Sequence, residues 1–532
     1  NSKEYLRYLA SSQYLINNST FQPFYLPKKN QIYINTWHGT PLKKMGFEIP
    51  GNPAHSQNVI RNFLCTDYLI SPNEHTTKMF TDSYKLDGLY EGTIIEEGYP
   101  RIDLTLKTDP QRFKEKLRGL GLEFKNQTKT LLYAPTWKGK NVSNAKNDML
   151  QIIGDFRYVE EQVGDEYSLL VKVHPFLYKE AVNYEELKGK LVPDFIDTNE
   201  LLATVDLLVT DYSSVFFDFL VTGKPMIFYT WDADIYMDER GQYFPNDVLP
   251  GPIVYNSLEL AETIKQIEDI KPEFQGRYQQ MQQQFTRYED GNVTERVVQT
   301  IFSGDTEKVR SITGLANQKQ KILIYPGGMR DNGITSSFIN LMNNIDFNQY
   351  DVTCFTKTPK SNEIIKNINK VNKKVRFLFN PGIPVYDVFE VYRDKYVHYR
   401  GAGGRLGKRL YPEKSYMREH ARLFGKSQFD YVIDFSGYSL YWAKFLLAAK
   451  AKKKICYMHN DLLSDSERTI NGKKPHRINL RGLFSVYHRF DKLVSVSKGT
   501  MELNRKNLSK YADFDKFDYV MNSINPDKIL QS

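Results

Sequence analysis

Short apolar runs alternate with amphipathic stretches along most of the chain. In its first half these runs occupy residues 67–72, 130–137, 168–175, 206–211 and 225–230. Each run is long enough for a strand and too short for a typical buried helix. Strands that alternate with helices are typical of a parallel sheet with helices on both faces. The pattern therefore predicts an α/β fold.

The alternation of apolar runs and amphipathic stretches stops near residue 310, where the polar stretch 307–320 lacks apolar periodicity. Directly after it, "KILIYPGGMRDNGITSSF" predicts a new strand, a glycine-bearing loop and a helix, and further short apolar runs follow. A chain of 532 residues is also too long for one hydrophobic core. We predict domains at 1–124 and 125–305, a linker at 306–319 and a further domain at 320–532.

The stretch "NQIYINTWHGTPLKKMG" places a histidine just after a predicted strand. Residues 31–35 alternate in polarity, and glycine and proline then end the strand, so His38 follows its carboxyl end. Ligands bind at this edge of open α/β sheets, because a rigid scaffold holds the loops there. The alternative is a histidine whose hydrogen bonds are satisfied within a turn.

Three other predicted strand exits carry polar or cationic residues. They lie in "VKVHP", "YAPTWKG" and "DLLVTDYSS", and "GYPRID" adds an arginine. In the third of these, residues 211–214 precede a helix, so Asp211 or Ser213 could cap it. A helix start with two serine hydroxyls also suits a phosphate, and capping does not exclude that role.

These ordered motifs, with "VFFDFLVTGKPMIFY" and "YMDERGQYF", closely resemble the CDP-glycerol glycerophosphotransferase family, the teichoic acid polymerases and primases, over residues 1–300. The resemblance implies a GT-B-type pair of Rossmann-like domains, the first for the acceptor and the second for CDP-glycerol, followed by a third Rossmann-like domain. It implies transfer of glycerol phosphate to a lipid-linked or poly(glycerol phosphate) acceptor, with release of CMP, in the synthesis of teichoic acid or a related cell-surface polymer.

The same resemblance assigns the site. His38 and His174 match the family's two essential histidines, and a histidine with a pKa near ~6.5 can act as general base, a role we expect of His38. His174 would stabilise the β-phosphoryl group or the departing CMP. The expected substrate-binding residues are Gly39, Thr40, Arg101, Thr136, Lys172, Asp211, Tyr212, Ser213 and Ser214.

The second half resembles the amino-terminal half of a GT-B glycosyltransferase. Gly327, Gly328 and Gly333 match its opening glycine loop, and His459 lies in a later matching piece. The sugar-nucleotide-binding domain of such enzymes is expected to be missing. A plain α/β scaffold is the alternative for this half.

The charge distribution indicates which partners to expect. The net charge of +9 is concentrated in residues 399–426, which hold eight Arg or Lys against two Glu, so we expect peripheral attachment at the cytoplasmic face of an anionic membrane. A solvated helix face is the alternative. Nothing resembles a nucleic-acid-binding motif, so no such partner is expected.

The three cysteines lie far apart, which suits a reducing compartment. We expect no required cofactor, with Mg²⁺ at most a loosely bound counter-ion. "DAD" at 232–234 is not expected to hold a metal.

Other functions remain open at this stage. They are a CDP-ribitol or other polyol donor, a bifunctional protein whose main role is glycosyl transfer, and a non-catalytic polymer-binding scaffold. The chain starts at Asn1 within a helix-like pattern over residues 2–16, so we expect the first domain to lack its first strand or helix.

Overall fold

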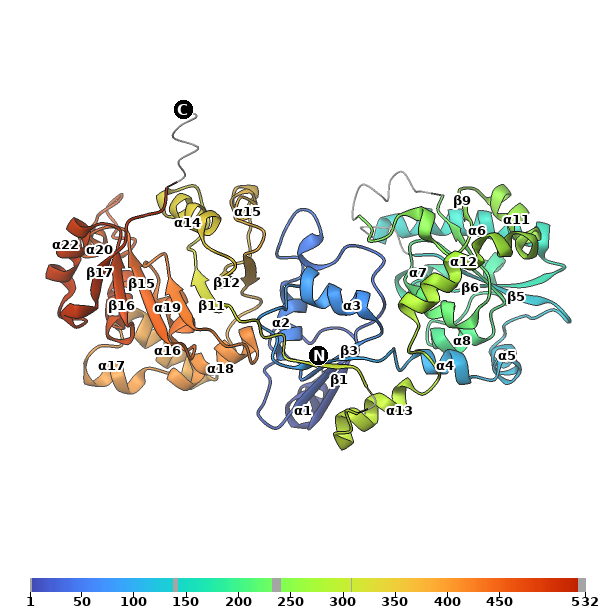
Figure 1. The fold of residues 1–532 in the computed structure, drawn as a ribbon, viewed down its shortest axis with the longest axis horizontal. Helices are drawn as coiled ribbons and strands as arrows, with labels where there is room; N and C mark the ends of the chain where they lie inside the picture. The colour runs from blue at the N-terminus through green and yellow to red at the C-terminus, as the bar shows by residue number, and fades with distance from the viewer. Residues whose placement is uncertain (1, 137–141, 232–240, 308, 525–532) are drawn as a thin grey trace, which may run out of the picture.

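The computed structural model describes residues 2–136, 142–231, 241–307 and 309–524. It is a mixed α/β structure with three sheets that lie side by side, the first sheet in the middle (Figure 1). The three cysteines are buried and free. Among helices in the described ranges, none combines the length and apolar composition needed to cross a bilayer.

The first sheet has the strand order β1-β2-β3-β4-β10. Its first four strands are parallel and β10 runs antiparallel to β4. The strands are β1 (Tyr14–Asn17), β2 (Ile32–Asn35), β3 (Tyr68–Ser71), β4 (Thr93–Glu96) and β10 (Ser311–Thr313). The accompanying helices are α1 (Lys3–Ser11), α2 (Gln57–Cys65), α3 (Glu74–Lys78) and α13 (Val293–Val298).

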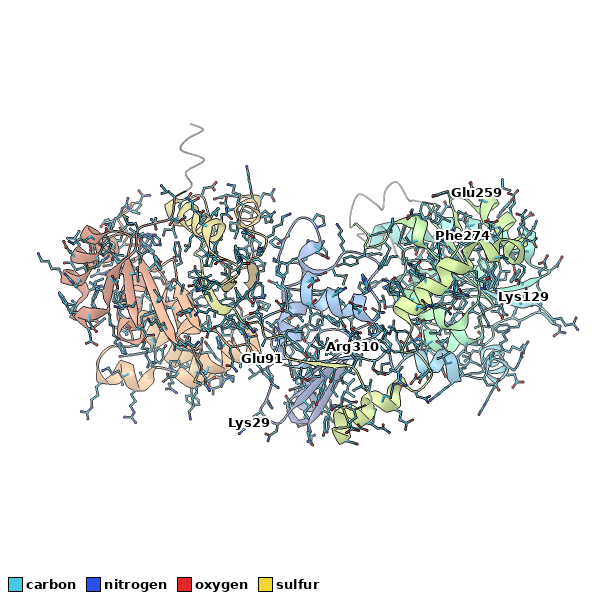
Figure 2. The ribbon with its side chains drawn as sticks, viewed as in Figure 1. Lys29, Glu91, Lys129, Glu259, Phe274 and Arg310 are labelled. Atoms are coloured by element: carbon cyan, nitrogen blue, oxygen red, sulfur yellow. The ribbon has the colours of Figure 1, made fainter. Side chains whose placement is uncertain are left out.

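Two expectations change in this sheet. The helix-like pattern at 2–16 divides into α1 and strand β1, because Tyr14 to Asn17 pair in register with β2. The expected linker 306–319 contains β10, which extends the sheet. Arg310, labelled in Figure 2, holds this strand in place through an ion pair with the buried Glu96 (2.8 Å).

The second sheet is fully parallel, with the order β6-β5-β7-β8-β9. Its strands are β5 (Lys129–Ala134), β6 (Tyr167–Val171), β7 (Leu207–Thr210), β8 (Met226–Tyr229) and β9 (Ile253–Val254). Its helices are α4 (Ile102–Lys107), α5 (Pro110–Gly119), α6 (Val142–Val163), α7 (Pro175–Ala181), α8 (Thr198–Ala203), α9 (Val215–Phe219), α11 (Ser257–Lys265) and α12 (Ile267–Phe285).

Core packing differs from the predicted boundary between residues 124 and 125. Phe113, Leu117 and Leu122 are buried against the second sheet, although the sequence assigned them to the first domain. On the return path, Val293 and Val297 pack on the apolar side chains of β2, β3 and β4. Amphipathic periodicity locates these helices, but it does not say which sheet they cover.

The third sheet is also parallel and has the order β13-β12-β11-β14-β15-β16-β17. Its strands are β11 (Gln320–Tyr325), β12 (Tyr350–Thr356), β13 (Arg376–Phe379), β14 (Tyr431–Asp434), β15 (Lys453–Met458), β16 (Lys492–Ser495) and β17 (Phe517–Tyr519). Its helices are α14 (Gly333–Asn344), α15 (Asn362–Asn369), α16 (Val388–Arg400), α17 (Gly404–Leu410), α18 (Glu413–Phe424), α19 (Leu440–Leu447), α20 (Leu462–Glu467), α21 (Arg477–Phe484) and α22 (Lys498–Leu508).

One hydrophobic core joins the first and third domains. It combines Phe63, Leu64 and Phe80 of the first with Phe355 and Phe424 of the third, all nearly inaccessible to solvent. Burial of a large apolar side chain contributes about 1.5–3 kcal/mol. The third domain is therefore packed firmly against the first.

Candidate active site

A cavity of about 220 Å³ lies between the loops of the first and second domains. The first domain contributes the segment that follows β2, and the second contributes the exits of β5 and β7. The lining residues are Trp37, His38, Gly39, Thr40, Pro41, Leu42, Lys43, Met45, Thr136, Tyr212, Ser213 and Ser214. The structure thus brings together seven of the predicted site residues.

Trp37 anchors the loop that carries His38. Its indole is 4% exposed and packs edge-on against Phe63 and Phe80. The backbone N–H of Trp37 donates to the side-chain oxygen of Asn35 (2.8 Å). The φ of Trp37 is 56°, in the left-handed region that a bulky residue rarely adopts. Such strain persists only where the surroundings enforce it, and here the buried ring does so.

The His38 imidazole is held in one tautomer. Its Nδ1 lies 2.9 Å from the carbonyl oxygen of Asn18. A carbonyl can only accept, so Nδ1 carries the proton and Nε2 of the neutral ring is the acceptor. His38 is exposed at the edge of the cavity, and partial desolvation by its surroundings lowers its pKa; the Asn18 hydrogen bond partly opposes this, and the Arg101 charge lowers the pKa further. The ring is therefore neutral near pH 7 and suited to accept a proton.

Gly39 allows the two domains to approach closely. A Cβ at this position would lie 2.9 Å from Ser214 Oγ and 3.6 Å from Arg101 Nη2. Any larger residue would therefore push the serine away. The Ser213 hydroxyl accepts a hydrogen bond from the Val215 N–H (3.3 Å) at the start of α9, although Ser214 is the N-cap residue and makes no side-chain capping bond.

Arg101 lies beside the cavity without lining it. Its Nη1 donates to the His38 carbonyl oxygen (2.9 Å), and its Nη2 forms an ion pair with the buried Asp218 (2.8 Å). Arg101 thus ties the His38 loop to helix α9 of the other domain and adds positive charge near the site.

Asp211 supports the cavity from behind. Its carboxylate accepts hydrogen bonds from the Thr136 N–H (3.0 Å) and from the Thr136 hydroxyl (2.8 Å). These charge-assisted bonds fix the exit of β5 against that of β7. The Asp211 side chain is 2% exposed and supports the cavity wall, and its contact with substrate stays a prediction.

Lys172 and His174 do not line this cavity. Lys172 Nζ donates to the Ile196 carbonyl oxygen (2.9 Å), and burial lowers its pKa. His174 caps α7, its Nδ1 accepting from the Phe176 N–H (3.3 Å), and its exposed ring stacks on the Phe176 ring. Burial lowers the pKa of His174 as well. A substrate would have to extend beyond the cavity to meet these two residues.

Sequence reasoning missed five of the lining residues: Trp37, Pro41, Leu42, Lys43 and Met45. Lys43 follows His38 by five positions, and a cation so close to a predicted ligand loop was the available signal. This segment pairs with the second domain, since the Tyr243 N–H donates to the Leu42 carbonyl oxygen (2.9 Å). Asn18 contributes only its backbone carbonyl to the contact with His38, so its residue type could not have indicated it.

Some predicted positions are outside the described residues. They are Trp137, Lys138 and the "DAD" residues 232–234. Within the described ranges, no group of three His, Cys, Asp or Glu side chains is placed to hold a metal ion.

The basic stretch 399–426 is only partly a surface patch. Arg422 is completely buried, and Arg418 and Lys426 pair with Glu390 and Asp67. The remaining five cations are exposed: Arg400, Arg405, Lys408, Arg409 and Lys414. Charge counting along the sequence could not reveal that α18 turns part of its basic face inward.

Comparison with known proteins agrees with this arrangement of motifs. The family described as CDP-glycerol:poly(glycerophosphate) glycerophosphotransferase matches residues 1–303. A teichoic acid poly(glycerol phosphate) polymerase of Bacillus spizizenii is 32% identical over 315 residues, covering 57% of this chain and 77% of that protein. A teichoic acid glycerol-phosphate transferase of Staphylococcus aureus is 34% identical over 311 residues, covering 56% and 78%.

Among solved structures, the wall teichoic acid polymerase TagF superposes with a TM-score of 0.50 and 28% identity, covering 57% of this chain and 75% of that one. The family match spans both domains that form the cavity and ends before the third sheet begins. The chain therefore belongs to the CDP-glycerol:poly(glycerophosphate) glycerophosphotransferase family and is an enzyme of teichoic acid synthesis.

Proposed function

We propose that residues 1–303 transfer glycerol phosphate from CDP-glycerol to a lipid-linked or poly(glycerol phosphate) acceptor. The observation that carries this proposal is the fixed tautomer of His38, whose Nε2 can accept a proton in a cavity that serine hydroxyls of the other domain also line. The first two sheets would form a GT-B-type pair around this cavity. The third would be a further Rossmann-like domain resembling half of a glycosyltransferase.

In the reaction, His38 Nε2 takes the proton from the acceptor hydroxyl as its oxygen attacks the β-phosphorus of CDP-glycerol. The bond from that phosphorus to the bridging oxygen breaks, and CMP leaves with the electron pair. Charge on the phosphoryl oxygens requires donors aimed at it. Ser213, Ser214, Thr136 and Lys43 line the cavity and are suited to that role.

Replacing His38 tests the base assignment. His38→Ala should lower kcat by about 100-fold or more, because general base catalysis is lost, with CDP-glycerol affinity nearly unchanged. Ser213→Ala and Ser214→Ala should instead weaken CDP-glycerol binding. CMP release with a lipid-linked acceptor and calorimetric titration with CDP-glycerol measure the two effects. Undiminished CMP release by His38→Ala would contradict the assignment.

The choice of polyol is a separate question. Competition between mass-tagged CDP-glycerol and CDP-ribitol would answer it. We expect glycerol phosphate in the product. If ribitol phosphate were the major product, the donor would be CDP-ribitol, and the proposed phosphoryl transfer step would still apply.

We further propose that the chain attaches peripherally to an anionic bilayer at its cytoplasmic face through what we call the α16–α17 surface. Three aromatic residues of α16 are strongly exposed, Phe389 (80%), Tyr392 (68%) and Tyr399 (63%), and their spacing places them on one face of the helix. The exposed cations Arg400, Arg405, Lys408 and Arg409 follow them along the chain, at the end of α16 and in α17. Aromatic and basic side chains together suit a lipid headgroup region, where each cation contributes about 1 kcal/mol.

Co-sedimentation with vesicles tests this attachment. Phe389→Ser/Tyr392→Ser should weaken binding to vesicles with anionic lipid by about fivefold or more, since less apolar surface enters the bilayer. Phe195→Ser is the matched control, because Phe195 is 72% exposed on the second domain. Equal binding by both variants, or binding indifferent to anionic lipid, would contradict the proposal.

A further inference from the structure

The loop at residues 18–25 sets the position of the His38 ring, because it begins with the carbonyl group that binds His38 Nδ1. Near this end, Asn35 of β2 donates to the Ser19 carbonyl oxygen (2.8 Å). At the far end, Arg61 of α2 donates to the carbonyl oxygens of Gln22 and Tyr25, both at 3.0 Å. The loop is thus tied to the first domain at both ends.

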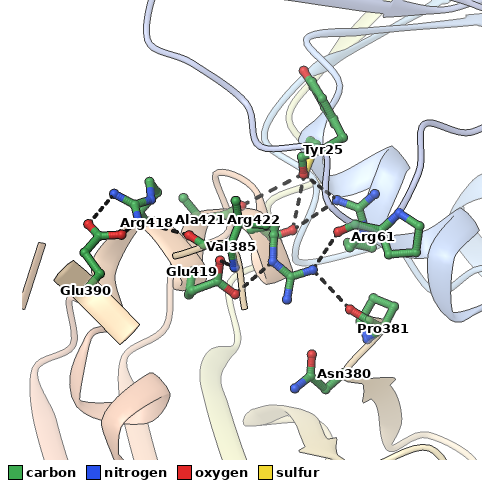
Figure 3. A network of polar contacts seen from close by, with 12 residues as sticks. Tyr25, Arg61, Asn380, Pro381, Val385, Glu390, Arg418, Glu419, Ala421 and Arg422 are labelled. Carbon is green, nitrogen blue, oxygen red and sulfur yellow. Dashed lines mark hydrogen bonds and ion pairs between the residues drawn. The ribbon is translucent and has the colours of Figure 1, made fainter. Parts of the chain in front are cut away.

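The third domain adds an anchor in the middle of this loop. Arg422 of α18 has no accessible surface, and its Nη1 donates to the Pro23 carbonyl oxygen (2.7 Å). The same Nη1 binds the Pro381 carbonyl oxygen (3.1 Å), so the guanidinium joins backbone of both domains. Figure 3 shows it between Arg61 and Glu419.

The charge of Arg422 is balanced within the third domain. Arg422 Nε pairs with Glu419 Oε2 (2.9 Å), and both side chains are fully buried. Arg61 Nη1 donates to the Arg422 carbonyl oxygen (3.4 Å), which ties the two arginines together. A buried charge is costly unless it is paired and hydrogen-bonded. Moving the loop carbonyls would leave these buried guanidinium groups without hydrogen-bond acceptors, so such a movement is unfavourable.

We infer that α18 of the third domain is a positioning element of the transferase site, and that Arg422, through Pro23 and the loop 18–25, keeps the Asn18 carbonyl in place to hold the His38 ring. Arg422 does not touch substrate. The third domain is then part of the machinery of glycerol phosphate transfer, although its sheet lies outside the segment that matches the family. This inference rests on the proposed role of His38 as base.

The variant Glu419→Gln/Arg422→Met tests it in the full-length chain. Both charges are removed together, because removing one alone would leave the other buried and unpaired. We expect kcat to fall on the order of tenfold, since a small misplacement of a catalytic group is costly. The affinity for CDP-glycerol should stay unchanged. The nitrogen chemical shifts of the His38 imidazole should show a mixture of tautomers in place of the Nδ1-protonated form.

A matched control exists at the other end of the same interface. Arg376 of β13 is 4% exposed, pairs with Asp351 (3.0 Å) and donates to the Lys85 and Asp87 carbonyl oxygens, both at 2.5 Å. Asp351→Asn/Arg376→Met thus removes a buried ion pair that also joins the two domains but does not touch the loop 18–25. It should lower thermal stability comparably and leave the His38 tautomer and kcat near their native values.

The outcomes separate the two proposals. If both double variants lose kcat equally, or if Glu419→Gln/Arg422→Met keeps native kcat and a native His38 spectrum, the inference is wrong. If His38→Ala retains turnover, the base assignment fails instead. The spectrum then still reports whether Arg422 controls the ring.

Discussion

At the scale of single residues, the lowered pKa of His38 makes a prediction about pH. The base works only when unprotonated, so kcat/KM should fall as the pH decreases through the pKa of His38. Because partial desolvation lowers that pKa, the midpoint should lie below the ordinary histidine value of about 6.5. A pH profile of CMP release measures it. A midpoint above that value would contradict the lowered pKa of this ring.

Gly39 gives a second prediction at this scale. In Gly39→Ala the new Cβ would meet Ser214 Oγ at 2.9 Å. Ser214 must then shift, and we expect CDP-glycerol affinity and kcat each to fall by about tenfold. Gly119→Ala is the control, since a Cβ there meets nothing within 4 Å. Steady-state kinetics of both variants measure these changes. Equal kcat and CDP-glycerol affinity in the two variants would contradict the role of Gly39.

Much of the site could be predicted at the residue scale. The cavity contains His38, Gly39, Thr136 and the two serines because strand exits of parallel sheets carry their loops to one edge. What the motifs left open was the direction of individual side chains. A motif does not say whether a carboxylate such as that of Asp211 points toward the ligand or binds the neighbouring strand exit.

At the scale of elements, the link between the β5 and β7 exits can be tested. Asp211→Asn removes the charge and one of the two oxygens that accept from Thr136, so Thr136 should be held less firmly. A hydrogen bond to a charged group is worth about 1.5–3 kcal/mol. We therefore expect a loss of CDP-glycerol affinity of about tenfold or more, measured by calorimetric titration.

Asp206→Asn is the control for that change. Asp206 Oδ2 accepts from the Thr130 N–H (2.9 Å), the same kind of bond at the opposite ends of these strands. Equal loss of affinity in both variants would mean a general loosening of the sheet.

The strands themselves were largely predictable, and the exceptions have physical reasons. Buried parallel strands are continuous apolar runs, which the sequence displays clearly for β5, β7 and β8. The short β10 is missing from the prediction because it is polar and depends on its pairing with β4. Its existence is decided by tertiary contact and not by local pattern.

At the scale of the whole molecule, the shared core predicts joint unfolding of the first and third domains. Phe424 of α18 is fully buried there and packs on Phe355. Phe424→Ala should cost about 3–5 kcal/mol and raise amide hydrogen exchange in both the first and third sheets. The second sheet should be unaffected.

Phe216→Ala is the converse experiment, since Phe216 is buried in the core of the second domain. It should raise exchange in the second sheet alone. If Phe424→Ala loosens only the third sheet, the two domains are independently stable units in contact.

The chain crosses twice between the second domain and the rest of the molecule, and these crossings bear on how substrate enters the cavity. Because the first and third domains share a core, we expect the cavity to open by rotation of residues 102–285. The backbone enters that body at 97–101 and leaves it at 286–292. Each crossing contains a glycine with positive φ, Gly98 at 99° and Gly291 at 85°. We expect these two residues to act as the hinge, which would make the speed of substrate entry and CMP escape depend on their torsions.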